Sequence, residues 1–230
     1  MVLALLVALS LLAWLYLVTL HGGFWRADAR LPRAVPRRAA WPGVAVVIPA
    51  RDEAETIGPV LAAHLRSTYP GAMSVIVVDD GSSDGTGAVA RATAEGASRP
   101  VHAIGAPPLP AGWTGKLWAL ETGIAAARER APGAEWLLLT DADIRHAPDT
   151  LARLVGLAED RGLDLASLMA RLDARGVWGR LLIPAFVFFF QKLYPFSWVN
   201  DPAQPEAGAA GGCVLVRRGA LEAAGGIAAI

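Results

Sequence analysis

The stretch SVIVVDDGSSDGT, residues 74–86, decides the fold. It opens with an apolar run rich in Val and Ile, which predicts a strand buried on both faces of a sheet. The run ends in Asp79 and Asp80, and the Gly, Ser and Asp residues that follow favour a tight turn. Ser and Asp also stand where they can cap a helix that begins near Thr86. A strand, a turn and a helix in this order predict an α/β unit.

The same alternation extends along the chain in both directions. Upstream, VAVVIPA at residues 44–50 predicts another buried strand, and apolar residues recur at helical spacing over residues 53–67. Downstream, the pattern predicts strands at 101–104, 136–140 and 165–170, and helices from near 86 and at 117–130 and 148–160. We therefore expect an α/β fold with a mostly parallel mixed sheet and helices on both faces. Such a sheet binds its ligand beyond the carboxyl ends of its strands.

Composition sets the broad class of the protein. The chain has 230 residues, enough for one good-sized domain with its own core. Its formal net charge is zero, so no overall field favours nucleic acid and no acidic excess favours disorder. Cys213 is the only cysteine, which excludes an internal disulfide framework and a zinc site made of several cysteines. We expect it to be a buried, unreactive thiol.

The N-terminus differs from the rest of the chain. Residues 2–20 contain no charge and are about long enough to cross the core of a bilayer. Neither a basic start nor a small-residue cleavage site accompanies them, which disfavours a secretory signal. We expect a single transmembrane anchor at residues 1–22, a basic linker at 23–42 and one domain at 43–230, although a buried core helix is the alternative for the apolar run. The arginines of the linker indicate that the domain lies on the cytoplasmic side of the inner membrane.

Asp141 and Asp143 follow the predicted strand at residues 136–140. Residues two apart in an extended segment point the same way, so the two carboxylates can share Mg²⁺ or Mn²⁺, which prefer oxygen ligands. Two carboxylates leave most of the coordination shell to water or to the phosphates of a nucleotide diphosphate. The alternative is that either aspartate only caps the helix after Pro148.

Asp79 and Asp80 also allow two interpretations. With the turn after them they are typical of a strand end followed by a helix cap. A carboxylate in this place can also accept the imide N–H of uracil or a ribose hydroxyl, which explains why two of them stand together. The sequence contains neither G-x-G-x-x-G nor G-x-x-x-x-G-K-[ST], so it favours neither a dinucleotide-binding fold nor a P-loop.

Four motifs follow one another in an order that resembles inverting family 2 glycosyltransferases of the GT-A fold. They are VAVVIPARDEAETI, VIVVDDGSSDGT, GKLWAL and LLLTDADI, and the resemblance covers about residues 44–227. PAFVFFFQKLYPFSWVND and AAGGCVLVRRGALEAAGGI are further similar to the hopene-associated glycosyltransferases of this family. The resemblance implies transfer of a sugar from a nucleotide-diphosphate donor, such as a UDP-sugar, to a membrane lipid acceptor in hopanoid biosynthesis.

The resemblance also implies a set of site residues. On the donor side, the positions that match the family's motifs are Ala50, Arg51, Asp52, Glu53, Asp79, Asp80, Lys116 and Asp141. Among them, Glu53 matches an acidic residue that faces the base or ribose, and Asp79 and Asp80 match the pair beside the uracil. Lys116 matches a residue near the donor phosphates, although a plain surface charge is its alternative.

The metal and acceptor sides follow in the same way. Asp141 and Asp143 match the two ligands of Mn²⁺ or Mg²⁺, and Asp143 is the expected direct ligand. Gly211, Gly212 and Cys213 match the segment that approaches the sugar from the acceptor side, with close packing at a strand start as the alternative.

The implied reaction is a single displacement. The metal ion and Lys116 stabilise the diphosphate as it leaves, and a base takes the proton of the acceptor hydroxyl, so that the anomeric centre inverts. In the family this base is an aspartate that follows the GG…RR…GG region, and we expect it beyond Ile230. Glu222, on a predicted helix, is expected to be solvated instead. The sequence therefore resembles the donor-binding portion of a transferase that is cut short.

Residues 181–190 form a second apolar stretch, which contains Pro184 and is too short to span a bilayer comfortably. Trp178, Tyr194 and Trp198 flank it. The stretch is therefore either an interfacial segment, with aromatic side chains at headgroup depth, or a buried core helix. An interfacial segment would bring a lipid acceptor to the open edge of the sheet.

These features together predict a membrane-anchored glycosyltransferase. One alternative within this class is a polyprenyl-phosphate or polysaccharide glycosyltransferase. Outside it, the alternatives are a nucleotidyltransferase on a similar sheet and a nucleotide-sugar-binding fragment without catalysis. A nucleotidyltransferase would need a glycine-rich basic phosphate loop near the first strand, which the sequence lacks.

Overall fold

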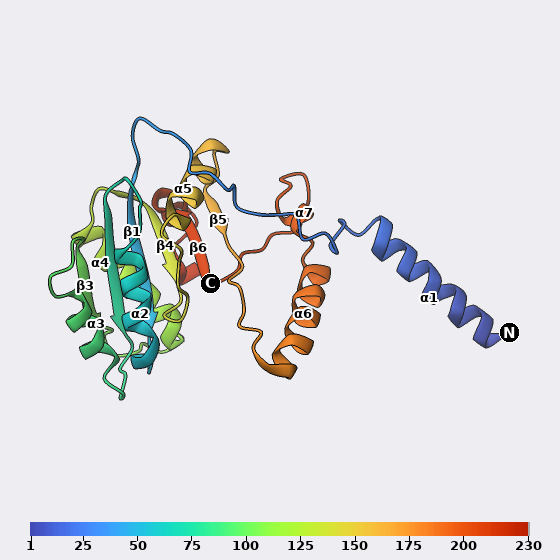
Figure 1. Ribbon diagram of the computed structural model, residues 1–230, viewed down its shortest axis with the longest axis horizontal. Coiled ribbons are helices and arrows are strands. Elements are labelled where there is room, and N and C mark those ends of the chain that lie inside the picture. Colours follow the sequence, from blue (N-terminus) through green and yellow to red (C-terminus); the bar gives the residue numbers. More distant parts are fainter. Residues whose placement is uncertain (230) are drawn as a thin grey trace. The chain divides into compact units, whose positions relative to one another are not determined.

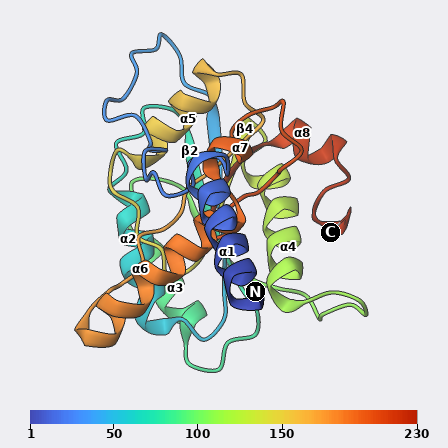
Figure 2. The same cartoon turned by 90° about the vertical axis from the view of Figure 1, so that its right-hand side faces the viewer.

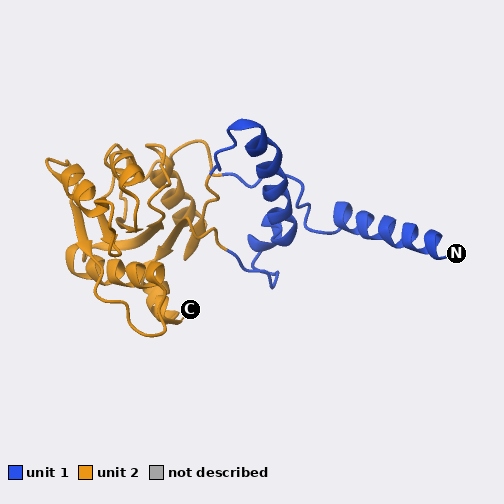
Figure 3. Ribbon diagram, turned by 90° about the horizontal axis from the view of Figure 1, so that it is seen from below, with its two compact units in different colours: residues 1–30, 171–208 blue, residues 31–170, 209–230 orange. Residues whose placement is uncertain are grey.

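The computed structural model describes residues 1–229, and the chain divides into two compact units (Figure 3). Unit 1 combines Met1–Arg30 with Arg171–Gly208, and unit 2 combines Leu31–Ala170 with the segment that starts at Ala209. The sheet belongs to unit 2. The division into anchor, linker and domain at residues 22 and 42 stays a prediction.

Unit 2 is built from six strands and their connecting helices (Figure 1). The strands are β1 (Gly43–Ala50), β2 (Met73–Asp79), β3 (Val101–Gly105), β4 (Ala134–Thr140), β5 (Leu165–Ser167) and β6 (Cys213–Arg217). The helices are α2 (Ala54–Leu65), α3 (Thr86–Ala94), α4 (Gly115–Arg130), α5 (Thr150–Asp160), α8 (Arg218–Ala223) and the 3-10 helix η1 (Ile227–Ala229). Unit 1 contains α1 (Val2–Thr19), α6 (Gly176–Leu193) and α7 (Phe196–Val199).

The strand order of the sheet is β3-β2-β1-β4-β6-β5. β1 pairs in parallel with β2 and β4, and β2 pairs in parallel with β3, whereas β6 runs antiparallel between β4 and β5. The predicted mostly parallel mixed sheet is therefore confirmed. The order reverses at β1, because the chain first builds outward to β3 and then places β4 on the other side of β1. In open α/β sheets, ligands bind in the crevice at such a reversal.

Both faces of the sheet are covered, which explains the continuous apolar runs of the strands. In β1, Val44, Val46 and Ile48 pack with residues of α2, α3 and α5, whereas Ala45 and Val47 pack with residues of α4. Figure 2 shows α2 and α5 on one side of the sheet and α4 and α8 on the other. All five side chains are at most 1% exposed, so alternate residues of one strand fill two separate cores.

The structure confirms one local prediction in part and corrects another. The helix after β2 begins at Thr86 as expected, but its N-cap is Gly85, with φ of 92°, and no side chain caps it from that position. The residue before the cap supplies the acceptor instead, because the Asp84 carboxylate receives the Thr86 N–H at 3.0 Å. β5 ends at Ser167, earlier than expected, and pairs antiparallel with β6.

The two apolar stretches outside the sheet both form 18-residue helices, α1 and α6. Neither helix has a buried residue, so the structure contradicts the core-helix alternatives for both stretches. By length and composition, each is long and apolar enough to cross a membrane. α6 extends the expected stretch at both ends, since Gly176–Arg180 and Gln191–Leu193 continue the helix, and Pro184 lies inside it.

Candidate functional site

Two acidic residues meet at the carboxyl edge of the central strands. β2, β1 and β4 are neighbours and run in parallel, so their carboxyl ends lie side by side. Asp80 follows β2 and donates its backbone N–H to the carbonyl of Ala50 at the end of β1, at 2.9 Å. Asp141 follows β4. Both carboxylates therefore lie at the edge of the sheet where the sequence predicts them.

The side chains of Asp80 and Asp141 each face a cation. Lys116 Nζ lies 2.6 Å from Asp141 Oδ1, and Arg51 Nη1 lies 3.5 Å from Asp80 Oδ2. The cations are the more exposed partners, because Lys116 is 56% and Arg51 64% exposed, against 31% for Asp141 and 16% for Asp80. The acidic side chains are thus held at the edge of the sheet, while the basic ones reach over them from solvent.

The start of α4 brings the two pairs together. A Cβ atom on Gly115 would lie 2.3 Å from Asp80 Oδ2, so a side chain here would displace this carboxylate. Lys116 is the next residue and reaches Asp141. The GK pair of the GKLWAL motif therefore contacts both acidic clusters, which the sequence order alone did not show.

A second group of polar residues joins the start of α2 to the turn after β2. Backbone N–H groups at the start of α2 donate to side chains of that turn: Asp52 N to Ser82 Oγ at 3.0 Å, Glu53 N to Thr86 Oγ1 at 2.7 Å and Ala54 N to Asp84 Oδ2 at 2.9 Å. These are donors that a helix start leaves without partners. The hydrogen bonds to its own loop and to Ala54 lower the pKa of Asp84, with the Thr86 hydroxyl the largest cause.

Three of the expected donor-side carboxylates are engaged with this local structure. Asp52 has a φ of 52° and accepts the N–H of Ser83 at 2.8 Å. Asp79 Oδ1 accepts the N–H of Ser82 at 2.9 Å. Glu53 is the N-cap of α2 and accepts the hydroxyl of Thr56 at 2.5 Å. Asp52 joins the two loops, whereas Asp79 and Glu53 bond within their own turn and helix.

The acceptor-side segment lies directly against the turn that carries Asp141. The carbonyl of Gly212 accepts both the Asp141 N–H at 3.2 Å and the Thr140 hydroxyl at 3.0 Å. A Cβ atom on Gly212 would lie 2.6 Å from Ile144 Cδ1, so a side chain here would displace the end of the Ile144 side chain. Cys213 begins β6 and is 2% exposed, and burial raises the pKa of its thiol to about 11. It is the buried thiol that the sequence predicts.

Sequence reasoning missed a pair of histidines that pack together beside the same turn. His146 Nε2 lies 3.1 Å from Thr140 Oγ1, and its ring packs against that of His64, tilted by 38°, at 4.8 Å between centroids. The Thr140 hydroxyl donates to a carbonyl, so His146 Nε2 carries the proton and donates to Thr140. Burial lowers the pKa of both histidines, that of His64 to about 3. The signal in the sequence was His64 itself, which stands among apolar residues at helical spacing.

The carboxylates after β4 suit a hard cation bound together with a ligand. Asp141 is half-buried and Asp143 exposed, and neither caps α5, whose N-cap is Asp149. Within residues 1–229, no group of three or more His, Cys, Asp and Glu side chains gathers as a metal site. Two carboxylates fit Mn²⁺ or Mg²⁺ if diphosphate oxygens and water complete the shell.

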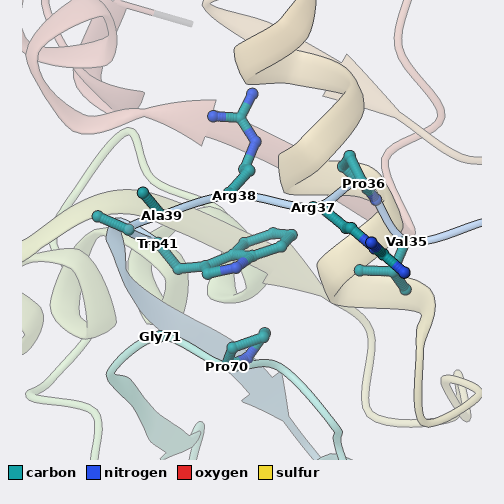
Figure 4. A pocket seen from close by; sticks show the side chains of 9 residues that line it. Val35, Pro36, Arg37, Arg38, Ala39, Trp41, Pro70 and Gly71 are labelled. Carbon is teal, nitrogen blue, oxygen red and sulfur yellow. The ribbon is translucent and has the colours of Figure 1, made fainter.

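The structure also has a shallow hollow of about 620 Å³ that is unrelated to these residues (Figure 4). It is lined by Val35, Pro36, Arg37, Arg38, Ala39, Ala40, Trp41, Pro70 and Gly71. Trp41 precedes β1 and Gly71 precedes β2, so the hollow lies at the amino ends of the strands. Ligands of open α/β sheets bind at the opposite edge, where Asp141 lies.

The chain resembles known proteins both in sequence and in structure. Over 129 residues it is 35% identical to polyprenol monophosphomannose synthase of Mycolicibacterium smegmatis, which covers 53% of this chain and 42% of that protein. The mannosyltransferase PcManGT from Pyrobaculum calidifontis, solved with GDP-Man and Mn²⁺, superposes with a TM-score of 0.62 and 25% identity over 92% of this chain and 57% of that one. The chain thus spans about half the length of these relatives.

A third similar structure contains UDP, whereas PcManGT contains GDP-Man. Glucosyl-3-phosphoglycerate synthase from Mycobacterium tuberculosis, solved with Mn²⁺, UDP and glucosyl-3-phosphoglycerate, has a TM-score of 0.50 and 25% identity over 78% of this chain and 58% of that one. The similarity to the hopene-associated subgroup stays a prediction. The sequence profile of glycosyl transferase family 2 matches residues 45–225, which are most of the chain. The chain belongs to glycosyl transferase family 2 and has the GT-A-like fold of that family.

Proposed function

We propose that the carboxyl edge of β2, β1 and β4 binds a nucleoside-diphosphate sugar, and that the whole protein transfers this sugar to a membrane lipid. The observation that carries the proposal is the pair of Lys116 and Asp141, 2.6 Å apart where the strand order reverses. Exposed ion pairs contribute little to stability, typically about 0–1 kcal/mol, so this pair can open at small cost when a ligand binds. In the bound state, Lys116 then pairs with the diphosphate, and Asp141 binds a cation.

The base and ribose belong on the other side of the same edge. The carboxylate of Asp80 can accept a hydrogen bond from a ligand. Within residues 1–229, its side chain has Arg51 as its only hydrogen-bond or ion-pair partner. A carboxylate there accepts an imide or hydroxyl proton. In this proposal Ala50, Asp52, Glu53 and Asp79 shape the donor site, because the last three hold its loops in place.

The metal would bind at Asp141 and Asp143. Mn²⁺ or Mg²⁺ would supply charge for the leaving diphosphate when bound. Lys116 would stabilise the same developing charge, and the Gly212 carbonyl, tied to the Asp141 N–H, would keep the acceptor-side segment beside it. The proposal assigns no catalytic base among residues 1–229. Glu222 is a poor candidate, because it pairs with Arg128 at 2.9 Å.

A polyprenyl phosphate is the acceptor class we favour. The name of the Mycolicibacterium smegmatis relative supports it, and the exposed apolar helix α1 suits a protein anchored in the membrane that holds such a lipid. The positive flank after α1 supports a cytoplasmic position for unit 2. A hopanoid lipid is the second candidate, supported by the similarity of PAFVFFFQKLYPFSWVND and AAGGCVLVRRGALEAAGGI to hopene-associated enzymes.

The test is a titration of UDP and of GDP into the purified chain in detergent, with and without Mn²⁺. Wild type should bind one of them in a Mn²⁺-dependent manner. The double variant Asp141→Asn, Asp143→Asn should lose that dependence, with affinity falling by more than the roughly 10–100-fold expected from losing an outer-shell partner. The nucleotide that binds more tightly identifies the donor.

The matched control is Asp160→Asn, Asp164→Asn, which removes the same two charges from a region that pairs with Arg38 and Arg217. It should bind the nucleotide like wild type. Folded wild-type protein without any metal-dependent binding of UDP or GDP would overturn the proposed donor site. Lipid extracts incubated with the radioactive nucleotide sugar then separate a polyprenyl phosphate product from a glycosylated hopanoid.

A further inference from the structure

Helix α6 carries an exposed apolar stripe along one face. Its members are Trp178, Leu182, Phe186, Phe189 and Leu193, and each is 52–71% exposed. Their spacing of four, four, three and four residues keeps them on one face of a helix. Arg180, Pro184 and Gln191 fall on the opposite face, together with the exposed Val177, and the exposed Leu181 and Phe188 lie between the two faces. No residue of α6 is buried, so within the part of the chain described, nothing covers the stripe.

The C-terminal end of α6 is fastened to the residues that follow α1. His21 Nε2 lies 2.8 Å from the carbonyl of Lys192, and the rings of Phe24 and Phe188 meet edge to face at 5.1 Å. The ring of Trp198 packs on that of His21 at 4.8 Å. We call these contacts the α1–α6 joint. They hold α6 next to the point where α1 ends, inside unit 1 (Figure 3).

The surroundings of the α1–α6 joint match the headgroup region of a bilayer. A hollow of about 400 Å³ beside it is lined by Val18, Thr19, Gly22, Gly23, Phe24, Trp25, Arg26, Asp28, Phe196, Ser197, Trp198, Asp201 and Gln204. Tryptophans and charged groups in one place are typical of the membrane–water interface, where aromatic rings sit at headgroup depth. An α1 that spans the bilayer would end at this depth.

We propose that α6 lies flat in the membrane interface, with the stripe from Trp178 to Leu193 immersed in lipid. This rests on the proposed role of α1 as the anchor. A crossing is disfavoured, because Arg180 and Lys192 leave only the segment between them free of charge, and that is too short for a bilayer core. The committed partner is the lipid surface itself.

The attachment points of this segment link the surface to the donor edge. The chain leaves unit 2 after Ala170 and returns at Ala209. Leu168 N donates to the carbonyl of Cys213 at 3.0 Å, and Ala210 N donates to Ser167 Oγ at 3.1 Å. Both ends are therefore rooted beside the acceptor-side segment. The α6 segment is thus joined covalently to unit 2 at both ends next to the acceptor-side segment.

The test uses an environment-sensitive dye on single cysteines in the full chain, reconstituted in vesicles of phosphatidylglycerol and phosphatidylcholine. Phe186→Cys places the dye on the stripe, and Pro184→Cys is the matched control at the same point along the helix but on the opposite face. Wild type serves as the labelling control, because Cys213 is its only cysteine and is 2% exposed. Nitroxide lipids report contact with acyl chains, and iodide reports contact with water.

Nitroxide lipids should quench most of the fluorescence at position 186 and little at 184, and iodide should do the reverse. Quenching of both positions by nitroxide lipids would mean that α6 crosses the bilayer. Quenching of both by iodide, in protein that floats with the vesicles, would mean that lipid does not cover the stripe. Either result overturns the proposal. Protein that does not float with the vesicles would instead contradict the proposed anchor, α1.

Discussion

Five aspartates of the motifs fall into two groups that look alike in sequence and differ in their partners. Asp52, Asp79 and Asp84 accept backbone N–H groups, and the bonds of Asp52 and Asp84 join the turn after β2 to the start of α2. Asp80 and Asp141 face the exposed cations Arg51 and Lys116. All five stand at or near the same edge of the sheet.

In the proposed donor site, this difference separates residues that support the loops from residues that bind the ligand. A backbone N–H cannot move away without a cost to the fold, so a carboxylate that accepts it is committed to structure. A lysine or arginine on a flexible stem can turn to a phosphate, and its carboxylate partner can then take a metal ion or a hydroxyl proton. Under the proposed function, the residues expected to contact the donor are therefore Asp80, Asp141 and the residues around them.

The largest change in stability is expected where the first group is disturbed. Thr86 is fully buried, and its hydroxyl accepts the Glu53 N–H at 2.7 Å and donates to Asp84. Thr86→Val keeps the shape but leaves that N–H without its partner, so the free energy of unfolding should fall by about 1–3 kcal/mol. Urea unfolding in mild detergent measures this.

The control for this prediction is Thr93→Val. The Thr93 hydroxyl donates only to the carbonyl of Val89 in its own helix, at 2.8 Å, and its loss should change the free energy of unfolding by less than about 0.5 kcal/mol. Thr86→Ser should restore most of the stability. Equal free energies of unfolding for Thr86→Val and wild type would contradict the structural role assigned to the first group of aspartates.

The free energy of unfolding is expected to depend on pH through the buried histidines His64 and His146. Burial lowers the pKa of His64 to about 3, whereas an unfolded histidine titrates near 6.5. Between these values the unfolded chain binds more protons than the folded one, so stability falls as the pH is lowered. The slope from His64 should approach about 1.4 kcal/mol per pH unit.

His64→Phe keeps an aromatic ring and removes the titration. Its free energy of unfolding, followed by urea unfolding from pH 7 to pH 4.5, should fall less steeply than that of wild type. His146 contributes in the same direction, because burial also lowers its pKa. Parallel slopes for the two proteins would show that the buried ring of His64 does not resist protonation.

The smallest expected change concerns the exposed cation of the second group. Lys116→Ala should weaken binding of UDP or GDP in the presence of Mn²⁺ about tenfold, equivalent to about 1.4 kcal/mol. Its thermal midpoint should stay near that of wild type, because the side chain is 56% exposed. Arg128→Ala removes an exposed cation from the same helix and should leave nucleotide affinity unchanged. Similar losses in both variants would point to general charge attraction.

The sequence predicts the sheet well because a strand that is buried on both faces appears as a continuous run of apolar residues. Strands such as β1 and β4 need apolar residues at every position, and the turns between them need Gly, Asp and Ser. The position of Asp80 and Asp141 follows from the same rule, since parallel strands share a carboxyl edge. The Gly115 approach to Asp80 depends on how α4 packs, which no local pattern encodes.

Side-chain pairing was far less predictable. Nothing in the spacing of Asp52 and Asp80 shows that one accepts backbone N–H groups and the other an arginine. The stack of His64 and His146 joins α2 to the turn after β4, and it depends on the tertiary fold. The length of α6 was underestimated because Arg180 and Lys192 interrupt the apolar run, whereas the helix continues through both residues.

The hydrogen bond from Thr140 to Gly212 closes a loop of 72 residues, and the whole α6 segment lies within it. The entropy lost on closing such a loop grows only with the logarithm of its length, so that doubling it costs about 0.6 kcal/mol. Pairing of β4 with β6 is therefore almost insensitive to how long the excursion is. The register of the sheet and the length of the α6 segment are nearly independent in free energy, and each can change through evolution without the other.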